Sequence, residues 1–303
     1  MTGVRWILVA LVLGSLAVPA DSRAQDEWAD VKIEVVPIKD GLHMLAGRGG
    51  NIGLSTGSDG TFLVDDQFAP LTERIEAAIR TVTEDGVRFL VNTHFHGDHT
   101  GGNENFGKSG TMIVAHENVR QRMSVDQFRE ILRQDETPAS PPDALPRITF
   151  TDAVTFHWNG DDIRIFHIHH AHTDGDSIIY FAKAGVFHMG DNFFNGMYPF
   201  IDVDFGGNVN GMIHAAERVL ELSSSETKII PGHGDLATPD DLRAFRDMLI
   251  AVRDRVQTMI NEGMTIEDVV ASKPTSSFDG PWEGNIERFV RAVFYSLKRA
   301  DTE

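Results

Sequence analysis

A chain of 303 residues that is 41% hydrophobic and 24% charged can bury a large core, and this composition excludes a disordered protein. The formal net charge of −18 gives a surface that repels phosphate backbones and anionic lipids, which argues against nucleic acid as a partner. The chain has no cysteine, so disulfides and thiolate metal ligands are excluded.

The first segment is typical of a secretory signal peptide. Arg5 precedes an apolar run over residues 6–18, which is too short to span a bilayer, and small residues mark cleavage points after Ala20 or Ala24. We therefore expect residues 1–24 to be removed and the protein to be periplasmic or secreted, with no membrane anchor that persists after cleavage. An uncleaved anchor is the alternative.

The remaining residues, 25–303, alternate between predicted strands and predicted helices. Strands are expected within residues 33–38, 42–47, 51–56, 61–66, 87–93, 111–116, 148–158, 162–171 and 177–191, and helices within 71–82, 208–222, 238–261 and 283–298. Residues 135–146 hold four prolines and predict an irregular surface loop. Two strand-rich halves with helices outside predict an α/β fold, an αββα sandwich of two mixed sheets covered by helices. We expect one domain, with a C-terminal helical extension over about residues 238–303.

The segment NTHFHGDHTGGN, residues 92–103, gathers three histidines and one aspartate within six residues. Residues two apart in an extended or tightly turned segment point the same way, so His94 and His96 can face one metal ion. Asp98 and His99 lie where the turn begins a helix and project toward a neighbouring point. Imidazole and carboxylate are common zinc ligands, so the segment predicts half of a site for two metal ions.

Three later segments can supply the other half of the site. His172 stands in HHAHTDGD, Asp191 in HMGDNF and His233 in IIPGHGD, each where a predicted strand ends and a loop begins. Catalytic groups are often found at such positions.

These motifs, in this order, resemble the metallo-β-lactamase superfamily over roughly residues 31–234. The resemblance implies a site along one sheet edge in which three residues hold the first metal ion, three hold the second and one bridges both. The ligands of the first ion would be His94, His96 and His172. Those of the second would be Asp98, His99 and His233, and the bridging residue would be Asp191. It also implies that Asp65 orients the ligand loop. Two Zn²⁺ ions per chain are expected, and iron or manganese would fit the same nitrogen and oxygen ligands.

The resemblance further implies a hydrolase acting on a small molecule. A water between two divalent ions has its pKa lowered toward ~7, and the hydroxide attacks a carbonyl carbon while Asp98, the catalytic residue, accepts a proton. A β-lactam is the first expectation for an exported enzyme of this family. Asp191 stands where some lactamases have cysteine and others lack a bridging carboxylate, so a lactonase or a glyoxalase II-like thioesterase stays open. An iron-dependent oxidoreductase of the same fold is a further alternative, which the complete second ligand set argues against.

The loop after Asp191 is a candidate substrate wall. Its apolar residues, which could face a substrate, are Phe193, Phe194, Met197, Tyr198 and Phe200; ordinary loop packing is the alternative. No Lys or Arg occurs between Lys183 and Arg218, so we expect no cation from this loop for a substrate carboxylate.

Several other histidines and acids are expected to have structural roles. We expect His167, His169 and His188 to pack within strands, and His116 to cap a helix or lie on the surface. Asp174 and Asp176 either support the ligand loop or belong to its turn. The sequence leaves the oligomeric state open.

Overall fold

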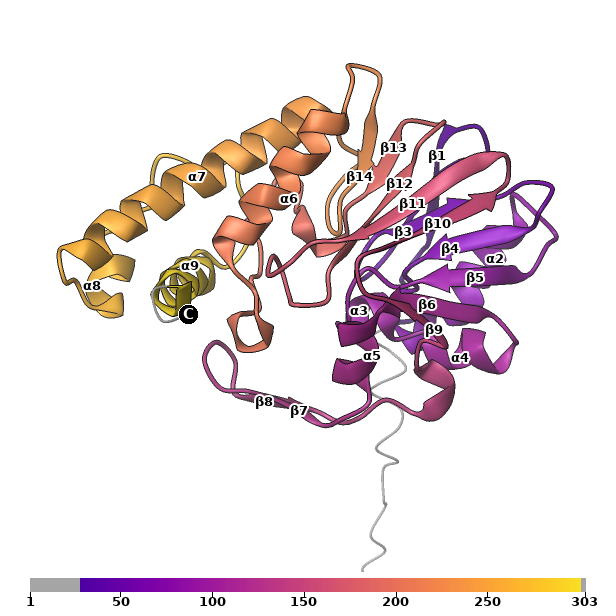
Figure 1. Ribbon diagram of the computed structural model, residues 1–303, viewed down its shortest axis with the longest axis horizontal. Coiled ribbons are helices and arrows are strands. Elements are labelled where there is room, and N and C mark those ends of the chain that lie inside the picture. The colour runs from indigo at the N-terminus through magenta and orange to yellow at the C-terminus, as the bar shows by residue number, and fades with distance from the viewer. Residues whose placement is uncertain (1–27, 301–303) are drawn as a thin grey trace, which may run out of the picture. The chain divides into compact units, whose positions relative to one another are not determined.

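The computed structural model describes residues 28–300 (Figure 1). The predicted signal peptide, residues 1–24, and both candidate cleavage points lie outside the described residues. The chain divides after Val31, and the unit that begins at Lys32 carries every strand and helix among the described residues. None of the helices in residues 28–300 combines the length and the apolar character that crossing a membrane requires.

The strands form two large sheets and one separate hairpin. The first sheet has the order β1 (Glu34–Lys39), β2 (Leu42–Ala46), β3 (Ile52–Ser55), β4 (Thr61–Val64), β5 (Val87–Val91), β6 (Met112–His116) and β9 (Ile148–Phe150). The second has the order β10 (Ala153–Trp158), β11 (Asp161–His167), β12 (Ser177–Phe181), β13 (Val186–His188) and β14 (Lys228–Ile230). The hairpin pairs β7 (Gln127–Arg129) with β8 (Asp135–Thr137).

Both large sheets are mixed. In the first sheet β1 to β4 pair antiparallel, and β4, β5, β6 and β9 are parallel to one another. In the second sheet only the pair of β13 and β14 is parallel. Two mixed sheets flanked by helices are the predicted sandwich.

The core between the two sheets explains why they pack face to face. Phe62 and Val64 of β4 alternate onto the same side of the first sheet, and Ile163 and Ile165 of β11 do so on the second. These side chains are fully buried in one cluster. Each contributes roughly 1.5–3 kcal/mol on removal from water.

Helices cover the outer faces of the sheets. The α-helices of the described residues are α2 (Thr72–Arg80), α3 (Gly97–Thr100), α4 (Asn103–Lys108), α5 (Glu117–Met123), α6 (Val209–Leu222), α7 (Pro239–Asn261), α8 (Ile266–Ala271) and α9 (Ile286–Ala300). Figure 1 shows α6, α7 and α9 grouped beside the second sheet. A second core cluster joins their apolar sides to β12, β13 and β14. In α7 this side presents Leu242, Phe245 and Leu249, and a capping box of Thr238 and Asp241 begins the helix.

Two segments differ from the sequence prediction. Residues 148–158, predicted as one strand, are broken at Thr151 and Asp152, so that β9 joins the first sheet and β10 the second. The apolar alternation continues across the break and therefore hides it. The predicted loop over residues 135–146 begins instead with β8, because Gln127–Arg129 lies close enough to pair with it. Neither strand of this hairpin has the apolar alternation that identifies a strand in a sequence.

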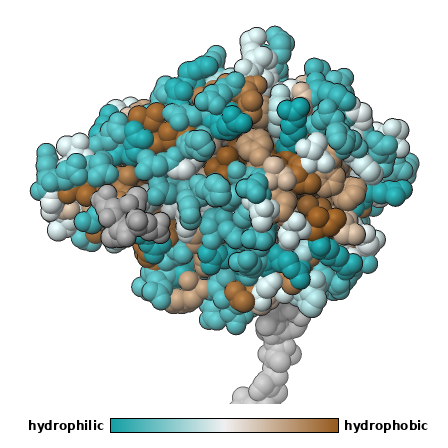
Figure 2. Space-filling view, viewed as in Figure 1, coloured by the Kyte–Doolittle hydropathy of each residue, from teal (hydrophilic) through white to brown (hydrophobic). Residues whose placement is uncertain are grey.

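The visible face of the molecule is largely hydrophilic, and its apolar side chains lie in separate patches (Figure 2). Large hydrophobic residues that are exposed among those described include Val125, Phe128 and Leu222. Isolated apolar residues of this kind are ordinary on protein surfaces.

Candidate metal centre

The loop after β5 positions the first group of polar side chains. β5 ends at Val91, and His96 keeps an extended backbone (φ −66°, ψ 146°) directly before α3. The extended backbone places His94 and His96 in one cluster, and the start of α3 moves Asp98 and His99 to another. The structure thus brings together the residues of the motif as the spacing predicts.

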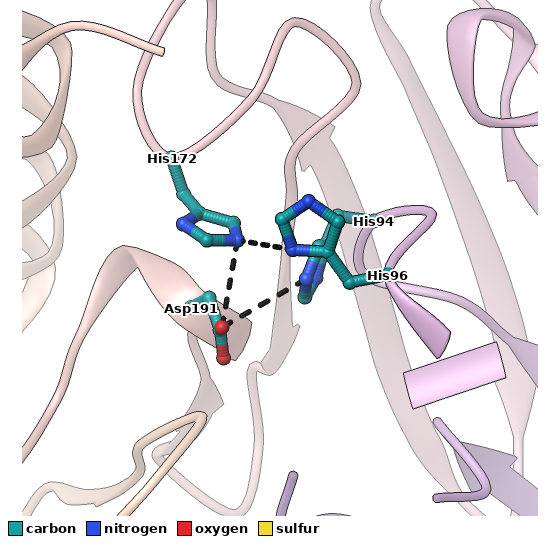
Figure 3. Close-up of side chains that lie close together, drawn as sticks. All are labelled: His94, His96, His172 and Asp191. Atoms are coloured by element: carbon teal, nitrogen blue, oxygen red, sulfur yellow. Dashed lines mark hydrogen bonds and ion pairs between the residues drawn. The ribbon is translucent and has the colours of Figure 1, made fainter. Parts of the chain in front are cut away.

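The first cluster consists of His94, His96, His172 and Asp191, which point toward one another (Figure 3). Nε2 of His172 lies 2.9 Å from Nδ1 of His96 and 3.4 Å from Oδ2 of Asp191. Nε2 of His94 lies 3.8 Å from the same oxygen. All four side chains are buried. Four nitrogen and oxygen atoms therefore converge on one point.

The second cluster consists of Asp98, His99 and His233. Nε2 of His233 lies 3.3 Å from Oδ2 of Asp98 and 3.3 Å from Oδ1 of Asp191. Nε2 of His99 lies 3.0 Å from the same Asp191 oxygen. Asp191 therefore presents Oδ2 to the first cluster and Oδ1 to the second, which is the position of the bridging carboxylate that the family resemblance implies.

Each of four imidazoles uses its outer nitrogen to hold a fixed tautomer. Nδ1 of His99 lies 2.7 Å from Asp65, Nε2 of His96 lies 2.7 Å from Asp202, and Nδ1 of His172 lies 2.7 Å from the carbonyl oxygen of Phe200. Nδ1 of His94 lies 3.0 Å from the Thr93 hydroxyl, which itself donates to Asp65. Each oxygen accepts a hydrogen bond from the N–H of the outer ring nitrogen, which leaves the inner nitrogen of the neutral ring with a free lone pair.

The inner atoms fit metal ions because they lack other partners. Nε2 of His94, Nε2 of His99 and Oδ1 of Asp191 are buried without a hydrogen bond, which costs about 1–3 kcal/mol for each atom. Nδ1 of His96 and Nε2 of His172 face each other at 2.9 Å. Because both rings already use their other nitrogen as the donor, a cation between these lone pairs removes the repulsion. Nitrogen and oxygen donors without thiolate suit zinc, manganese or iron.

The pKa shifts of the histidines also fit a site for metal ions. Burial lowers the pKa of His172 to about 4, and burial, with the nearby His99 and His172, holds the pKa of His94 well below its usual range. Burial opposes the charge of His233, but Asp191 raises the pKa of this imidazole to about 9. Asp191 thus favours a positive charge beside it, and a bound metal ion would supply such a charge in place of a proton.

Buried acids support the ligand loops from behind. Asp65 accepts hydrogen bonds from the backbone N–H and the hydroxyl of Thr93 as well as from His99. Asp176 accepts hydrogen bonds from the backbone N–H groups of His172 and Thr173. Asp176 therefore supports the ligand loop, and burial raises its pKa to about 8. Such outer partners orient the ligands and tune their affinity.

Glycines allow the close approach that the clusters require. A Cβ atom at Gly50 would lie 2.1 Å from the ring of His99, and one at Gly101 would lie 2.6 Å from the backbone oxygen of Gly97. Only glycine fits at either position without displacing its neighbour.

A pocket of about 550 Å³ opens onto the clusters. Asp98, Asp191 and His233 line it on the metal side, and the candidate wall residues Phe194, Met197 and Tyr198 line it beside them. Phe194 stacks on His233 with ring centroids 5.1 Å apart.

One candidate wall residue lies away from the pocket. Phe193 does not line the pocket; it is fully buried and packs on Phe245 in the core beside the second sheet. Phe200, two residues beyond Tyr198, lines the pocket together with Phe194, Met197 and Tyr198. The 3₁₀ turn at Gly190–Asn192 sets which side chains face inward, and the sequence carries no pattern that distinguishes them.

Sequence reasoning also missed the cations of the pocket. Arg129, Arg133 and Arg288 line it, from the β7–β8 hairpin and from α9. The loop between Lys183 and Arg218 indeed supplies no cation, but segments far away in the sequence do. Arg129 is held by Asp202, whose carboxylate it contacts at 2.9 Å. No local signal identifies these arginines, because only the fold brings them to the site.

The other histidines for which structural roles are expected lie outside the clusters, but His169 is exposed in the turn after β11 and does not pack within a strand. His188 is buried, with Nε2 3.0 Å from the carbonyl oxygen of Asn51. Nδ1 of His116 accepts a hydrogen bond from the backbone N–H of Asn118 and so caps α5. His167 stacks on His116 with ring centroids 3.8 Å apart.

The family model of the metallo-β-lactamase superfamily matches residues 45–233, which is more than half of the chain and includes all seven residues of the two clusters. The chain belongs to the metallo-β-lactamase superfamily. No curated protein matches it significantly.

Solved structures with the same superfamily fold agree with this assignment. The sec-alkylsulfatase Pisa1 from Pseudomonas sp. has a TM-score of 0.67 and 15% identity, over 89% of this chain and 52% of its own. A double mutant of that alkylsulfatase has a TM-score of 0.65 and 17% identity, over 93% and 53%. A metallo-β-lactamase from Pontibacter korlensis has a TM-score of 0.60 and 18% identity, over 72% and 99%. The chain spans about half the length of the alkylsulfatase, and at these identities the likeness shows the fold alone.

Proposed function

We propose that this superfamily member is a hydrolase that holds two divalent metal ions, zinc first, and cleaves an ester or amide bond in a small molecule. The observation that carries the proposal is the position of Asp191, whose two carboxylate oxygens face two separate ligand clusters. Both clusters border one pocket, so a substrate can reach both.

The side chains that line the pocket would have different roles in hydrolysis. Bound metal ions would polarise a carbonyl oxygen and lower the pKa of a water. Asp98 lines the pocket and its side chain is 27% exposed, so it can accept a proton from that water. Met197 and Tyr198 offer an apolar wall that excludes water from the substrate. The Tyr198 hydroxyl is not free for catalysis, because it donates to Asp279 at 2.9 Å.

Asp191 favours oxygen leaving groups over nitrogen. A carboxylate between two cations reduces their net charge and so weakens the stabilisation of an anionic amide nitrogen. An ester oxygen is a better leaving group than an amide nitrogen, so its departure depends less on stabilisation by the metal ions. We therefore propose a cyclic or aryl ester as the better substrate and a β-lactam as a slower one. A thioester of the glyoxalase II kind is the next class to test.

We also propose that the protein is exported, on the strength of the signal-like residues 1–24. The N-terminal sequence of protein recovered from the periplasm or the medium tests this. A new terminus after Ala20 or Ala24 supports export, and a full-length chain in the cytoplasmic fraction contradicts it.

The hydrolase proposal is tested by metal analysis together with a substrate panel. The zinc content of purified protein is measured, followed by kcat/KM on a penicillin, a carbapenem, an aliphatic lactone, an aryl ester, a thioester and a secondary alkyl sulfate. We expect two ions per chain and ester or lactone turnover at least equal to lactam turnover. Lactam values near ~10⁷–10⁸ M⁻¹s⁻¹ with no ester turnover would indicate a dedicated lactamase. Turnover of the alkyl sulfate alone would replace carbonyl chemistry with sulfate ester cleavage.

A further inference from the structure

Phe200 connects the metal ligands to two arginines. Its ring centroid lies 5.8 Å from that of His96 and 5.9 Å from that of His172. The guanidinium carbon of Arg133 lies 4.7 Å from the Phe200 centroid, and that of Arg288 lies 5.0 Å from it. Both arginines line the same pocket as Asp98 and His233. A single buried phenyl ring thus touches the first ligand cluster and two cationic groups.

These two cations are not neutralised by the residues around them. Among the described residues, Arg288 has no carboxylate within ion-pair distance, and Arg133 has only Asp135, at 3.8 Å and half exposed. Asp135 also pairs with Arg129 at 3.4 Å. The stack on Phe200 holds the guanidinium planes in place but leaves their N–H donors to solvent or to a ligand. Two N–H-rich groups therefore face the pocket with spare donors.

The position of Arg288 on its helix adds a second reason to expect an anion. It lies in the first turn of α9, where the helix dipole favours negative charge, and Asn285 caps that end by accepting its backbone N–H. Glu287, the acid of the same turn, pairs instead with Arg291 at 2.9 Å. Burial and the neighbouring Arg133 lower the pKa of Arg288. The arrangement is unfavourable without a counter-ion.

This concentration of cations is unusual for a chain with a formal net charge of −18. The acidic surface does not explain why two guanidinium groups face one pocket. Two such groups in a pocket attract anions into it. Arg288 also lies beyond residues 45–233, so the region that matches the superfamily does not include it.

We propose that Arg133 and Arg288 bind a carboxylate on the substrate, beside Phe200 and within reach of the metal centre. This inference rests on the proposed hydrolase function and specifies its substrate class: an ester or amide with a separate anionic group. Guanidinium groups hold carboxylates through paired, charge-assisted hydrogen bonds, which fix orientation as well as affinity. The substrate's apolar body would contact Phe194, Met197 and Phe200.

Matched p-nitrophenyl esters test the inference on the metal-loaded protein. The half-esters of adipic, pimelic and suberic acid carry a carboxylate, and p-nitrophenyl hexanoate, heptanoate and octanoate carry a methyl group in its place. We expect at least one half-ester to be favoured in kcat/KM by about tenfold or more, mainly through a lower KM. R133Q and R288Q should each remove most of that preference. R291Q, on the same helix but outside the pocket, should retain it.

Binding of uncleaved analogues separates this inference from the hydrolase proposal. Calorimetric titration with adipic acid monoanilide and with hexanoic acid anilide measures the same carboxylate preference without turnover. If no ester is cleaved but the monoanilide binds more tightly in the wild type alone, the hydrolase proposal fails and the carboxylate site stands. If no charged probe is preferred, or if the preference survives in R133Q and R288Q, the carboxylate site is overturned, whatever the turnover of neutral esters.

Discussion

Oδ2 of Asp65 lies 2.7 Å from Nδ1 of His99, so one buried carboxylate fixes the ring of a metal-cluster residue that is distant in sequence. The backbone of Asp65 has a φ of 62°, in the left-handed region that aspartate tolerates better than most residues. This conformation at the end of β4 turns the carboxylate toward the α3 loop. The second metal cluster therefore depends on a residue that is not itself a member of it.

Asp65→Asn should weaken the second metal site. The amide oxygen can replace one carboxylate oxygen as an acceptor, but the NH₂ group in place of the other would face the N–H donors of Thr93 or His99. We expect the affinity for the second ion to fall by about 10–100-fold, with a smaller change for the first. Zinc titration against a chromophoric chelator measures both affinities. Asp254→Asn, on the exposed side of α7, serves as the control, and equal affinities in both variants would remove the supporting role of Asp65.

Gly50→Ala should displace His99. Gly50 does not have a positive φ, so alanine fits its backbone, but the new Cβ would meet the His99 ring at 2.1–2.6 Å. We expect about one ion per chain in place of two and a strong loss of activity. Gly97→Ala is the matched control, because a Cβ at Gly97 has nothing within 4 Å. Metal content and a crystal structure of each variant test whether His99 is displaced and an ion is lost. Two ions in Gly50→Ala would show that His99 can move without loss of metal.

Asp98→Asn should reduce turnover far more than stability. The change removes the carboxylate that lies 3.3 Å from Nε2 of His233 and the proposed proton acceptor of the pocket. We expect kcat to fall by roughly 10²–10⁴-fold, the usual contribution of a positioned acid or base. The melting temperature of the metal-loaded protein should change little, because the side chain is partly exposed. A near-normal kcat would show that Asp98 has neither role.

His188 should make the fold less stable as the pH falls. Burial lowers its pKa to about 4, and the neutral ring donates to Asn51 and accepts a hydrogen bond from the backbone of Gly190. A histidine in the unfolded chain has a pKa near 6.5. Below about pH 6.5, therefore, His188 binds a proton in the unfolded chain but stays neutral in the folded chain until the pH approaches 4. The free energy of unfolding should therefore decrease by up to ~1.4 kcal/mol per pH unit between pH 6.5 and 4 from this residue.

Urea unfolding between about pH 5 and 7, in the presence of chelator, measures this slope. His188→Gln should show a shallower pH dependence than the wild type, whatever its absolute stability. His157→Gln, at a side chain that is 79% exposed, should keep the wild-type slope. Identical slopes in all three proteins would contradict the assignment.

The convergence of the candidate ligands into two clusters was predictable because the sequence signals are local. His94 to His99 lie in one loop, and each later ligand follows a strand with a clear apolar pattern. Pairing in the second sheet aligns the ends of β11, β13 and β14, and the packing of the two sheets brings the end of β5, in the first sheet, close to them. The sandwich was predictable for the same reason, since the strands and the longer helices carry period-two or helical patterns.

The pocket wall opposite the metal clusters could not be predicted, for physical reasons that are equally specific. The hairpin of β7 and β8 has no apolar alternation, and Arg133 and Arg288 meet only because Phe200 lies between distant segments. Asp202 holds both His96 and Arg129, yet nothing around it in sequence distinguishes it from a surface aspartate. The division of residues 148–158 between two sheets is a tertiary choice that strand propensity does not encode.

The location of the arginines on the β7–β8 hairpin and on α9 has an evolutionary consequence. The candidate ligand clusters lie in loops and turns that follow strands of the two large sheets, whereas the arginines lie on segments outside both sheets. Relatives of this chain could exchange the hairpin or the start of α9 and acquire different substrates without disturbing the metal centre. Selection can thus diversify substrate choice while the chemistry is conserved, and directed evolution of this protein can begin at the same two segments.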